Sequence, residues 1–124
     1  MEEQIEVNGL KYVLESSISK GQTRPKSLKG KEYCIIRTYS AGVFVGWIDR
    51  KKKGKENTIF QSRGIYYWEG AASLLQLAND GVKSPDKCKF TQIVQEIDLK
   101  EIIEIIPITS KAKKVIDTIK VWEK

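Results

Sequence analysis

The spacing of apolar residues changes abruptly near residue 69, and this change constrains the fold more than any other feature of the sequence. Before it, over 32–68, apolar and polar residues alternate with the period of two that is typical of β-strands. After it, over 69–81, apolar residues recur every three to four positions, as on one face of an α-helix. Short turns rich in glycine interrupt the alternating part, which therefore predicts a meander of antiparallel strands. We expect these strands at 32–39, 43–49, 56–62 and 64–68, with a bulge or bend at Arg63–Gly64.

The helix predicted over 69–81 is expected to pack on this sheet. Gly81 is suited to end it, because glycine readily adopts the backbone conformation that follows a helix. Its apolar stripe is formed by Ala71, Leu74, Leu75 and Ala78, with Leu77 flanking it.

Two strands and a second helix are predicted to follow. Residues 91–99 alternate as in a strand, and the isoleucine-rich segment 102–108, with Pro107, favours another strand over a helix. Thr109 or Ser110 is expected to cap a final helix. Its apolar stripe is formed by Ala112, Val115, Ile116, Ile119 and Trp122. The sequence thus predicts an α+β fold, a meandering antiparallel sheet with one helix packed across it and a C-terminal amphipathic helix.

The length of the chain predicts a single domain over 1–124. Within it we expect an N-terminal hairpin over 1–15, a flexible loop over 16–31 and a core over 32–124, since 16–31 is rich in Ser, Gly, Lys and Pro. The sequence has neither a run of about 18 apolar residues nor a secretory signal, so we expect a cytoplasmic protein that does not enter a membrane.

Composition narrows the classes of function. The chain has no histidine, the commonest metal ligand and general acid or base near neutral pH. This disfavours an enzyme but leaves catalysis by Asp, Glu, Lys or Tyr open, and we expect a binding protein without catalytic residues, metal or cofactor. Its 22 basic residues exceed the 16 acidic ones by 6, which suits an anionic partner, either a nucleic acid or a phosphorylated small molecule. The alternative is that the lysines only keep the surface soluble. Cys34 and Cys88 are expected to be buried free thiols.

The segment RTYSAGVFVGW, at 37–47, contains the first candidate site. Alternation along a strand places Arg37 and Tyr39 on one face, where a guanidinium binds phosphate and a phenol ring stacks on a base. Thr38 lies between them. The turn that begins at Ser40 presents backbone N–H groups, which also hold anions.

The segment SRGIYYWEG, at 62–70, contains the second candidate site. Arg63, Tyr66 and Trp68 precede the predicted helix, whose N-terminus favours a negative group. The competing interpretation is that the aromatic residues fill the core and that the arginine meets solvent or a carboxylate. The sequence leaves both interpretations open, and also whether Arg37 and Arg63 line one pocket.

Four segments occur in a recognisable order: RTYSAGVFVG, IYYWEGAASLLQLANDGVK, CKF and EIIEIIPIT. In these the chain resembles the phage anti-Thoeris proteins of the first type, over about 33–122. The resemblance implies a phage-encoded inhibitor of bacterial antiviral defence, a homo-oligomer built from dimers in the cytoplasm of the infected host. Such a protein acts as a sponge that binds and sequesters a cyclic ADP-ribose isomer, made by TIR-domain sensors, without degrading it. Some members of that family also bind cyclic oligonucleotides at a separate site.

The resemblance and the residue chemistry together define the candidate ligand-binding set. For phosphate and ribose we expect Arg37, Thr38, Tyr39, Ser40 and Arg63. For stacking the base we expect Tyr66, Trp68 or Phe90, with Lys87 at the mouth. Arg24 and Lys89 are candidates for a second anionic site. The family prefers a second arginine before the aromatic strand, whereas here only Arg63 stands there, which leaves one phosphate contact open.

Two other functions compete with the sponge. Basic charge interleaved with aromatic residues is also typical of proteins that bind single-stranded nucleic acids. Alternatively, the C-terminal helix and Trp122 bind and inhibit a host protein.

Overall fold

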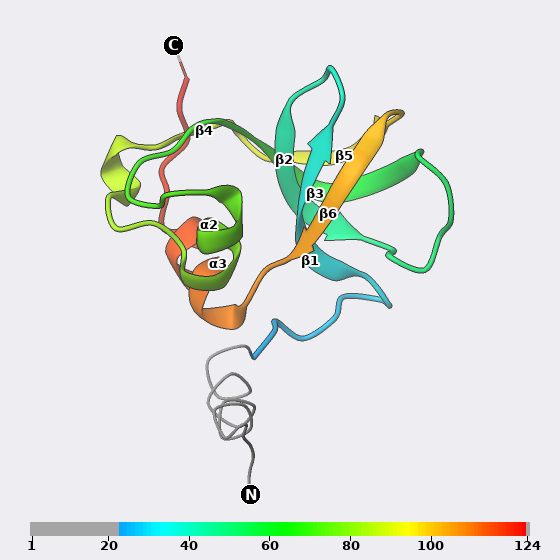
Figure 1. Cartoon of the computed structure of the whole chain (residues 1–124), viewed down its shortest axis with the longest axis horizontal. Coiled ribbons are helices and arrows are strands. Elements are labelled where there is room, and N and C mark those ends of the chain that lie inside the picture. The colour runs from blue at the N-terminus through cyan, green and yellow to red at the C-terminus, as the bar shows by residue number, and fades with distance from the viewer. Residues whose placement is uncertain (1–22, 124) are drawn as a thin grey trace, which may run out of the picture.

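The computed structural model of the chain describes residues 23–123. They form a six-stranded antiparallel sheet with two helices beside it (Figure 1), so the predicted α+β fold is confirmed. The hairpin predicted for 1–15, and residues 16–22 of the predicted loop, lie outside the described residues. The elements are β1 (Glu32–Thr38), β2 (Val43–Ile48), β3 (Asn57–Tyr67), α2 (Leu74–Asp80), the 3₁₀ turn η1 (Pro85–Lys87), β4 (Lys89–Phe90), β5 (Val94–Leu99), β6 (Ile102–Pro107) and α3 (Ser110–Asp117).

The order of the strands requires the sheet to curl. The sheet runs β3–β2–β1–β6, and β3 pairs on its other side with both β4 and β5. The edge strands β5 and β6 are nevertheless consecutive in the chain, with only Lys100 and Glu101 between them. A flat sheet would place them about 19 Å apart, whereas the three residue steps that join them span at most about 11 Å.

The strand predicted over 102–108 is confirmed as β6, and the strand predicted over 91–99 begins only at Val94.

A β-bulge lies where β2 pairs with β3. The register shifts between Val45 and Trp47, so that Gly46 lies opposite two residues, Gln61 and Ser62. Gln61 has a left-handed φ of 50°, which is uncommon for a residue with a side chain. Glycine is needed opposite it, because a Cβ on Gly46 would lie 2.5 Å from a side-chain carbon of β3. The bulge is two residues earlier than predicted, and β3 continues through it as one strand.

Alternation along the strands divides the apolar side chains between two cores. In β1, Tyr33 and Ile35 belong to the core on the helix side of the sheet, whereas Cys34 and Ile36 belong to a second core. The second core consists of Cys34, Ile36, Ile48, Ile59, Leu99 and Ile102. Cys34 and Cys88 are buried free thiols, as predicted.

Helix α2 is shorter than the predicted helix over 69–81. Gly70 has a φ of 98°, which helical residues do not adopt, and the helix begins only after Ser73. The Ser73 hydroxyl accepts a hydrogen bond from a backbone N–H of the first turn at 3.2 Å. The predicted end is confirmed, since Gly81 donates its N–H to the last turn of the helix at 2.9 Å.

The later start of α2 also changes which of its residues are buried. Leu77 and Ala78 are fully buried, whereas Leu75, which was predicted to lie on the apolar stripe, is 61% exposed. Both helices are short, and none within 23–123 has the length and apolarity needed to cross a membrane.

Helix α3 is capped by Thr109, one of the two residues predicted for this role. Its Oγ1 accepts the N–H of Ala112 at 3.1 Å. The helix ends at Asp117, so Trp122 lies beyond it, and its predicted place on the helix stripe is wrong. Trp122 instead donates its backbone N–H to the carbonyl of Phe90 at 2.9 Å, which attaches the C-terminal segment to β4.

Candidate functional site

Thr38, a predicted ligand contact, closes the turn between β1 and β2. The residue is buried; its Oγ1 donates to the carbonyl of Gly42 at 2.8 Å and accepts the N–H of Ala41 at 2.9 Å. These bonds satisfy the hydroxyl. The hydroxyl of Thr38, predicted to contact a ligand, is therefore used to shape the turn.

Arg37 and Ser40 bind carboxylates at the surface. Nε of Arg37 donates to Oε1 of Glu104 at 2.8 Å, and Oγ of Ser40 donates to Oε1 of Glu101 at 2.7 Å. The side chains of the Arg37–Glu104 pair are 45% and 42% exposed, so the pair stabilises the fold by at most about 1 kcal/mol. A phosphate can therefore compete for Arg37. Tyr39 beside it is 78% exposed and presents its ring to solvent.

Arg63 is buried, and its guanidinium bonds to the backbone. The acceptors are the carbonyls of Thr91, Ile116, Ile119 and Lys120, at 2.9, 3.4, 3.0 and 3.4 Å. Three of them lie at or just after the end of α3, where helical carbonyls have no partner inside the helix. Burial lowers the pKa of Arg63. The ring of Phe90 lies 5.3 Å from the guanidinium carbon and is fully buried. Arg63, predicted to bind phosphate, and Phe90, predicted to stack on a base, are thus both engaged inside the fold.

Tyr66 and Lys89 meet around Trp122 at the surface. The rings of Tyr66 and Trp122 stack with their centroids 4.7 Å apart and their planes at 18°. Nζ of Lys89 lies 5.3 Å from the centroid of the Trp122 ring. Tyr66 remains 69% exposed, so it can still present an aromatic face to a ligand. Sequence reasoning missed Trp122 here, because it assigned that residue to the helix.

Trp68 and Lys87 have local partners. Trp68 packs against the helix-side core, and its Nε1 donates to the carbonyl of Ala71 at 3.2 Å. Nζ of Lys87 lies 3.8 Å from a carboxylate oxygen of Glu69 at an exposed position. Trp68 is thus partly used by the core, whereas Lys87 is a surface cation.

Arg24 and Lys89, the predicted second anionic site, contact different parts of the fold. Arg24 lies 3.2 Å from a carboxylate oxygen of Glu32 at the start of β1, which Arg50 also approaches at 3.1 Å. Lys89 contacts the ring of Trp122, on the C-terminal segment. The contacts of these two residues give no indication of a shared site.

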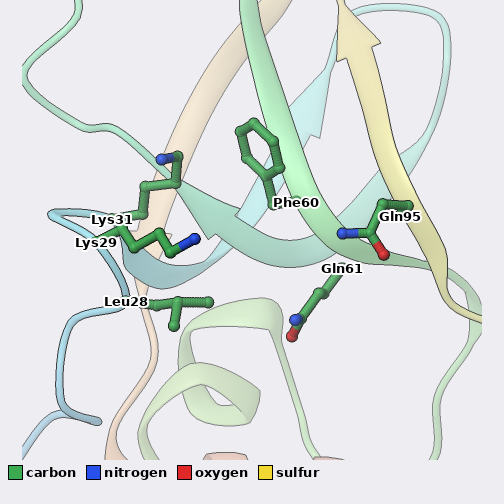
Figure 2. A pocket seen from close by; sticks show the side chains of 6 residues that line it. All are labelled: Leu28, Lys29, Lys31, Phe60, Gln61 and Gln95. Carbon is green, nitrogen blue, oxygen red and sulfur yellow. The ribbon is translucent and has the colours of Figure 1, made fainter.

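A pocket of about 280 Å³, which we call the lysine pocket, lies beside the β-bulge (Figure 2). It is lined by Leu28, Lys29, Lys31, Phe60, Gln61 and Gln95. In Figure 2 the lysines and Leu28 stand on one side, the glutamines on the other, and the Phe60 ring lies between them. Two ammonium groups, an aromatic ring and two carboxamides thus surround one hollow.

A tight turn and the β-bulge position the residues of the lysine pocket. Leu28 and Lys31 exchange two backbone hydrogen bonds of 2.9 Å, which close the turn. Nζ of Lys31 lies 4.7 Å from the centroid of the Phe60 ring. Gln61 is the bulge residue with positive φ, and such costly conformations concentrate at functional sites. Sequence reasoning missed this pocket, because it assigned the turn to a flexible loop and the bulge arises only from strand pairing.

The lysine pocket has the chemistry of an anion site. Ammonium groups bind phosphates, the ring offers a stacking surface, and carboxamides donate to and accept from ribose hydroxyls or base edges. Within residues 23–123, no group of three or more cysteine or carboxylate side chains is placed to hold a metal ion.

Comparison with known proteins assigns the chain to a family. Residues 31–116, from just before β1 to within α3, match the profile of a domain of unknown function (DUF6948). No curated protein and no solved structure matches the chain. The protein belongs to the DUF6948 family.

Proposed function

We propose that this protein is a non-catalytic sponge that binds and sequesters a nucleotide signal of the cyclic ADP-ribose type. Acting in the cytoplasm of an infected bacterium, it keeps the signal from its effector and so inhibits antiviral defence on behalf of the phage. The observation that carries the proposal is the lysine pocket, in which Lys29 and Lys31 stand beside the ring of Phe60.

The resemblance of RTYSAGVFVG and IYYWEGAASLLQLANDGVK to the anti-Thoeris proteins of the first type supports this choice of ligand. The net charge of +6 favours a ligand with two phosphates. The exposed pair of Arg37 and Tyr39 offers further phosphate and stacking contacts.

Energetic considerations favour a homo-oligomer, with dimers as the unit. Two charged hydrogen bonds contribute about 3–6 kcal/mol, and one stacked base contributes about 1–3 kcal/mol. Association itself costs at least about 4 kcal/mol. Nanomolar binding requires about −12 kcal/mol, so a single lysine pocket falls short and a neighbouring subunit has to add contacts. Light scattering coupled to size exclusion, with and without nucleotide, tests this part of the proposal.

The decisive experiment is calorimetric titration with a TIR-produced cyclic ADP-ribose isomer, followed by heat denaturation and mass spectrometry of the released nucleotide. We expect saturable tight binding and recovery of the intact nucleotide. A changed product would make the protein an enzyme, and the absence of binding would exclude the sponge.

A charge-matched pair of variants locates the site. The double variant Lys29→Gln/Lys31→Gln is expected to weaken nucleotide binding at least about tenfold, because it removes both ammonium groups of the pocket. The control, Lys51→Gln/Lys52→Gln, removes the same charge from the exposed loop between β2 and β3 and should leave affinity within about twofold. Equal losses in both variants would point to net charge rather than to the pocket.

The same loop favours the second candidate function, binding of single-stranded nucleic acid. Residues 50–55 read RKKKGK, and the residues are exposed. If this loop tracks a phosphate backbone, oligonucleotide affinity falls steeply with salt and falls further in the control variant than in the pocket variant.

A further inference from the structure

Two residues with an uncommon backbone conformation line the same pocket. Among residues 23–123, a positive φ is found at five glycines and at only two other residues, Lys29 with a φ of 52° and Gln61 with a φ of 50°. Both of these residues line the lysine pocket. Lys29 lies in the turn that Leu28 and Lys31 close, whereas Gln61 lies in the bulge of β3. Two separate features of the backbone thus bring their strained residues to one hollow.

Glycine or asparagine is the ordinary residue at both positions. The two central residues of the turn, Lys29 and Gly30, both have a positive φ, and turns of this kind strongly favour Asn-Gly or Gly-Gly. A bulge residue with a left-handed φ is typically glycine. Any other side chain raises the free energy of this conformation, because its Cβ crowds the following carbonyl oxygen.

Packing does not offset the strain at these two positions. The side chains of Lys29 and Gln61 are both exposed, so neither gains stability from burial in a core. In Figure 2 the Lys29 side chain extends toward the middle of the pocket, and Gln61 stands across the pocket from the lysines. Strained conformations of this kind concentrate at ligand clamps and other functional sites. The two side chains therefore indicate a role in binding rather than in folding.

The chemistry of the two side chains indicates which part of a ligand they contact. The ammonium group of Lys29 binds phosphate oxygens, whereas the carboxamide of Gln61 donates and accepts hydrogen bonds, as sugar hydroxyls do. In a nucleotide the sugar is bonded directly to the phosphate, so a polar group beside a phosphate site faces the sugar. The pocket volume of about 280 Å³ lies just below the range of about 300–1,000 Å³ for drug-sized ligands, which suits one sugar phosphate unit.

We propose that Lys29 and Gln61 form a clamp for a sugar phosphate, in which Lys29 binds the phosphate and Gln61 binds the adjoining hydroxyls. This inference rests on the proposed function for the phosphorylated class of the ligand, and it names the part of that ligand that enters the lysine pocket. It also explains why neither position is a glycine, although glycine would relieve the strain in the backbone.

Titration of the ¹⁵N-labelled full chain with ribose 5-phosphate and with inorganic phosphate, followed by amide NMR shifts, tests the clamp. Inorganic phosphate offers the anion without the sugar. We expect saturable shifts at the amides of Lys29 and Gln61, with ribose 5-phosphate binding about two- to tenfold more tightly, the effect of one or more hydrogen bonds. Neither probe is a cyclic nucleotide, so the clamp can hold where the sponge fails, and the two failures are distinguishable.

Two variants separate the phosphate contact from the sugar contact. Lys29→Asn removes the ammonium group and is expected to weaken binding of both probes at least about fivefold. Gln61→Gly removes the carboxamide and is expected to abolish the advantage of ribose 5-phosphate over inorganic phosphate. Lys53→Asn, the charge-matched control on the exposed loop between β2 and β3, should leave both affinities within about twofold.

Melting temperatures, measured by circular dichroism, provide a second readout. Neither Lys29→Asn nor Gln61→Gly should melt below the wild type, because each places a favoured residue in a left-handed conformation. A lower melting temperature in either variant would show that the side chain is kept for folding and would overturn the clamp.

The titrations can also overturn the proposal. Shifts that do not saturate would indicate general attraction of anions to a basic surface rather than a clamp. Equal affinity of the wild type for the two probes, or an unchanged advantage of ribose 5-phosphate in Gln61→Gly, would contradict the sugar contact. Binding by Lys29→Asn as tight as by the wild type would contradict the phosphate contact.

Discussion

Arg37 and Arg63 have the same side chain and opposite environments. Both stand on strands beside aromatic residues, and the sequence pattern therefore predicted the same role for both. Strand pairing places Arg37 beside Glu104 at the surface, whereas Arg63 extends beneath α3 and reaches its last carbonyls. The difference depends on helix α3, which begins almost 50 residues after Arg63, so local sequence could not reveal it.

Replacing each arginine by methionine is predicted to have very different effects on stability. Arg63→Met removes the hydrogen bonds of the buried guanidinium to four backbone carbonyls and leaves the buried carbonyl of Ile119 without it, so it should lower the free energy of unfolding by about 3 kcal/mol or more. Arg37→Met, the matched control, removes only an exposed ion pair and should cost less than about 1 kcal/mol. Urea unfolding followed by circular dichroism measures both, and equal costs would show that Arg63 does not anchor α3.

At the scale of elements, Thr109 joins the end of α2 to the start of α3. Its Oγ1 donates to the carbonyl of Asn79 at 2.6 Å as well as accepting the N–H of Ala112. Its own N–H donates to the carbonyl of Ala78 at 3.0 Å. The cap was predictable, because a threonine before an apolar stripe at helical spacing is a local signal. The second bond was not, since it depends on how the helices pack.

Thr109→Ala is predicted to lower the free energy of unfolding by about 1–3 kcal/mol, because it removes the cap and leaves the carbonyl of Asn79 unpaired. Thr109→Ser keeps the hydroxyl and loses only a methyl group, so it should cost about 1 kcal/mol or less. Thermal and urea unfolding of the two variants provides the comparison. A serine variant as unstable as the alanine variant would assign the effect to packing and not to the hydrogen bonds.

At the scale of the whole molecule, strand β1 connects the two cores. Alternate residues of this strand belong to the helix-side core and to the second core. Detachment of β1 would therefore disrupt both cores at once. Cys34 reports on the second core: it is fully buried, and burial raises the pKa of its thiol from 9.0 to about 12. Trp47 reports on the helix-side core.

Unfolding is therefore predicted to be a single cooperative transition. The native thiol of Cys34 should resist alkylation at pH 8, because the reactive thiolate forms only far above that pH. In a Cys88→Ser background, the urea midpoint for pulse labelling of Cys34 should coincide with the midpoint from tryptophan fluorescence. Labelling at lower urea than the loss of fluorescence would show that the two cores unfold separately.

The sequence by itself determined the class of the fold, the end of α2, the cap of α3 and most of the strands. These depend on short-range physics: the period of apolar residues, the turn preferences of glycine and the hydrogen bonds of a capping hydroxyl. Tertiary structure alone decided the burial of Arg63, the bulge opposite Gly46 and the lysine pocket. Each of these depends on which segments pair or pack across the fold, and a side chain's exposure is set by those distant neighbours rather than by its own place in the sequence pattern.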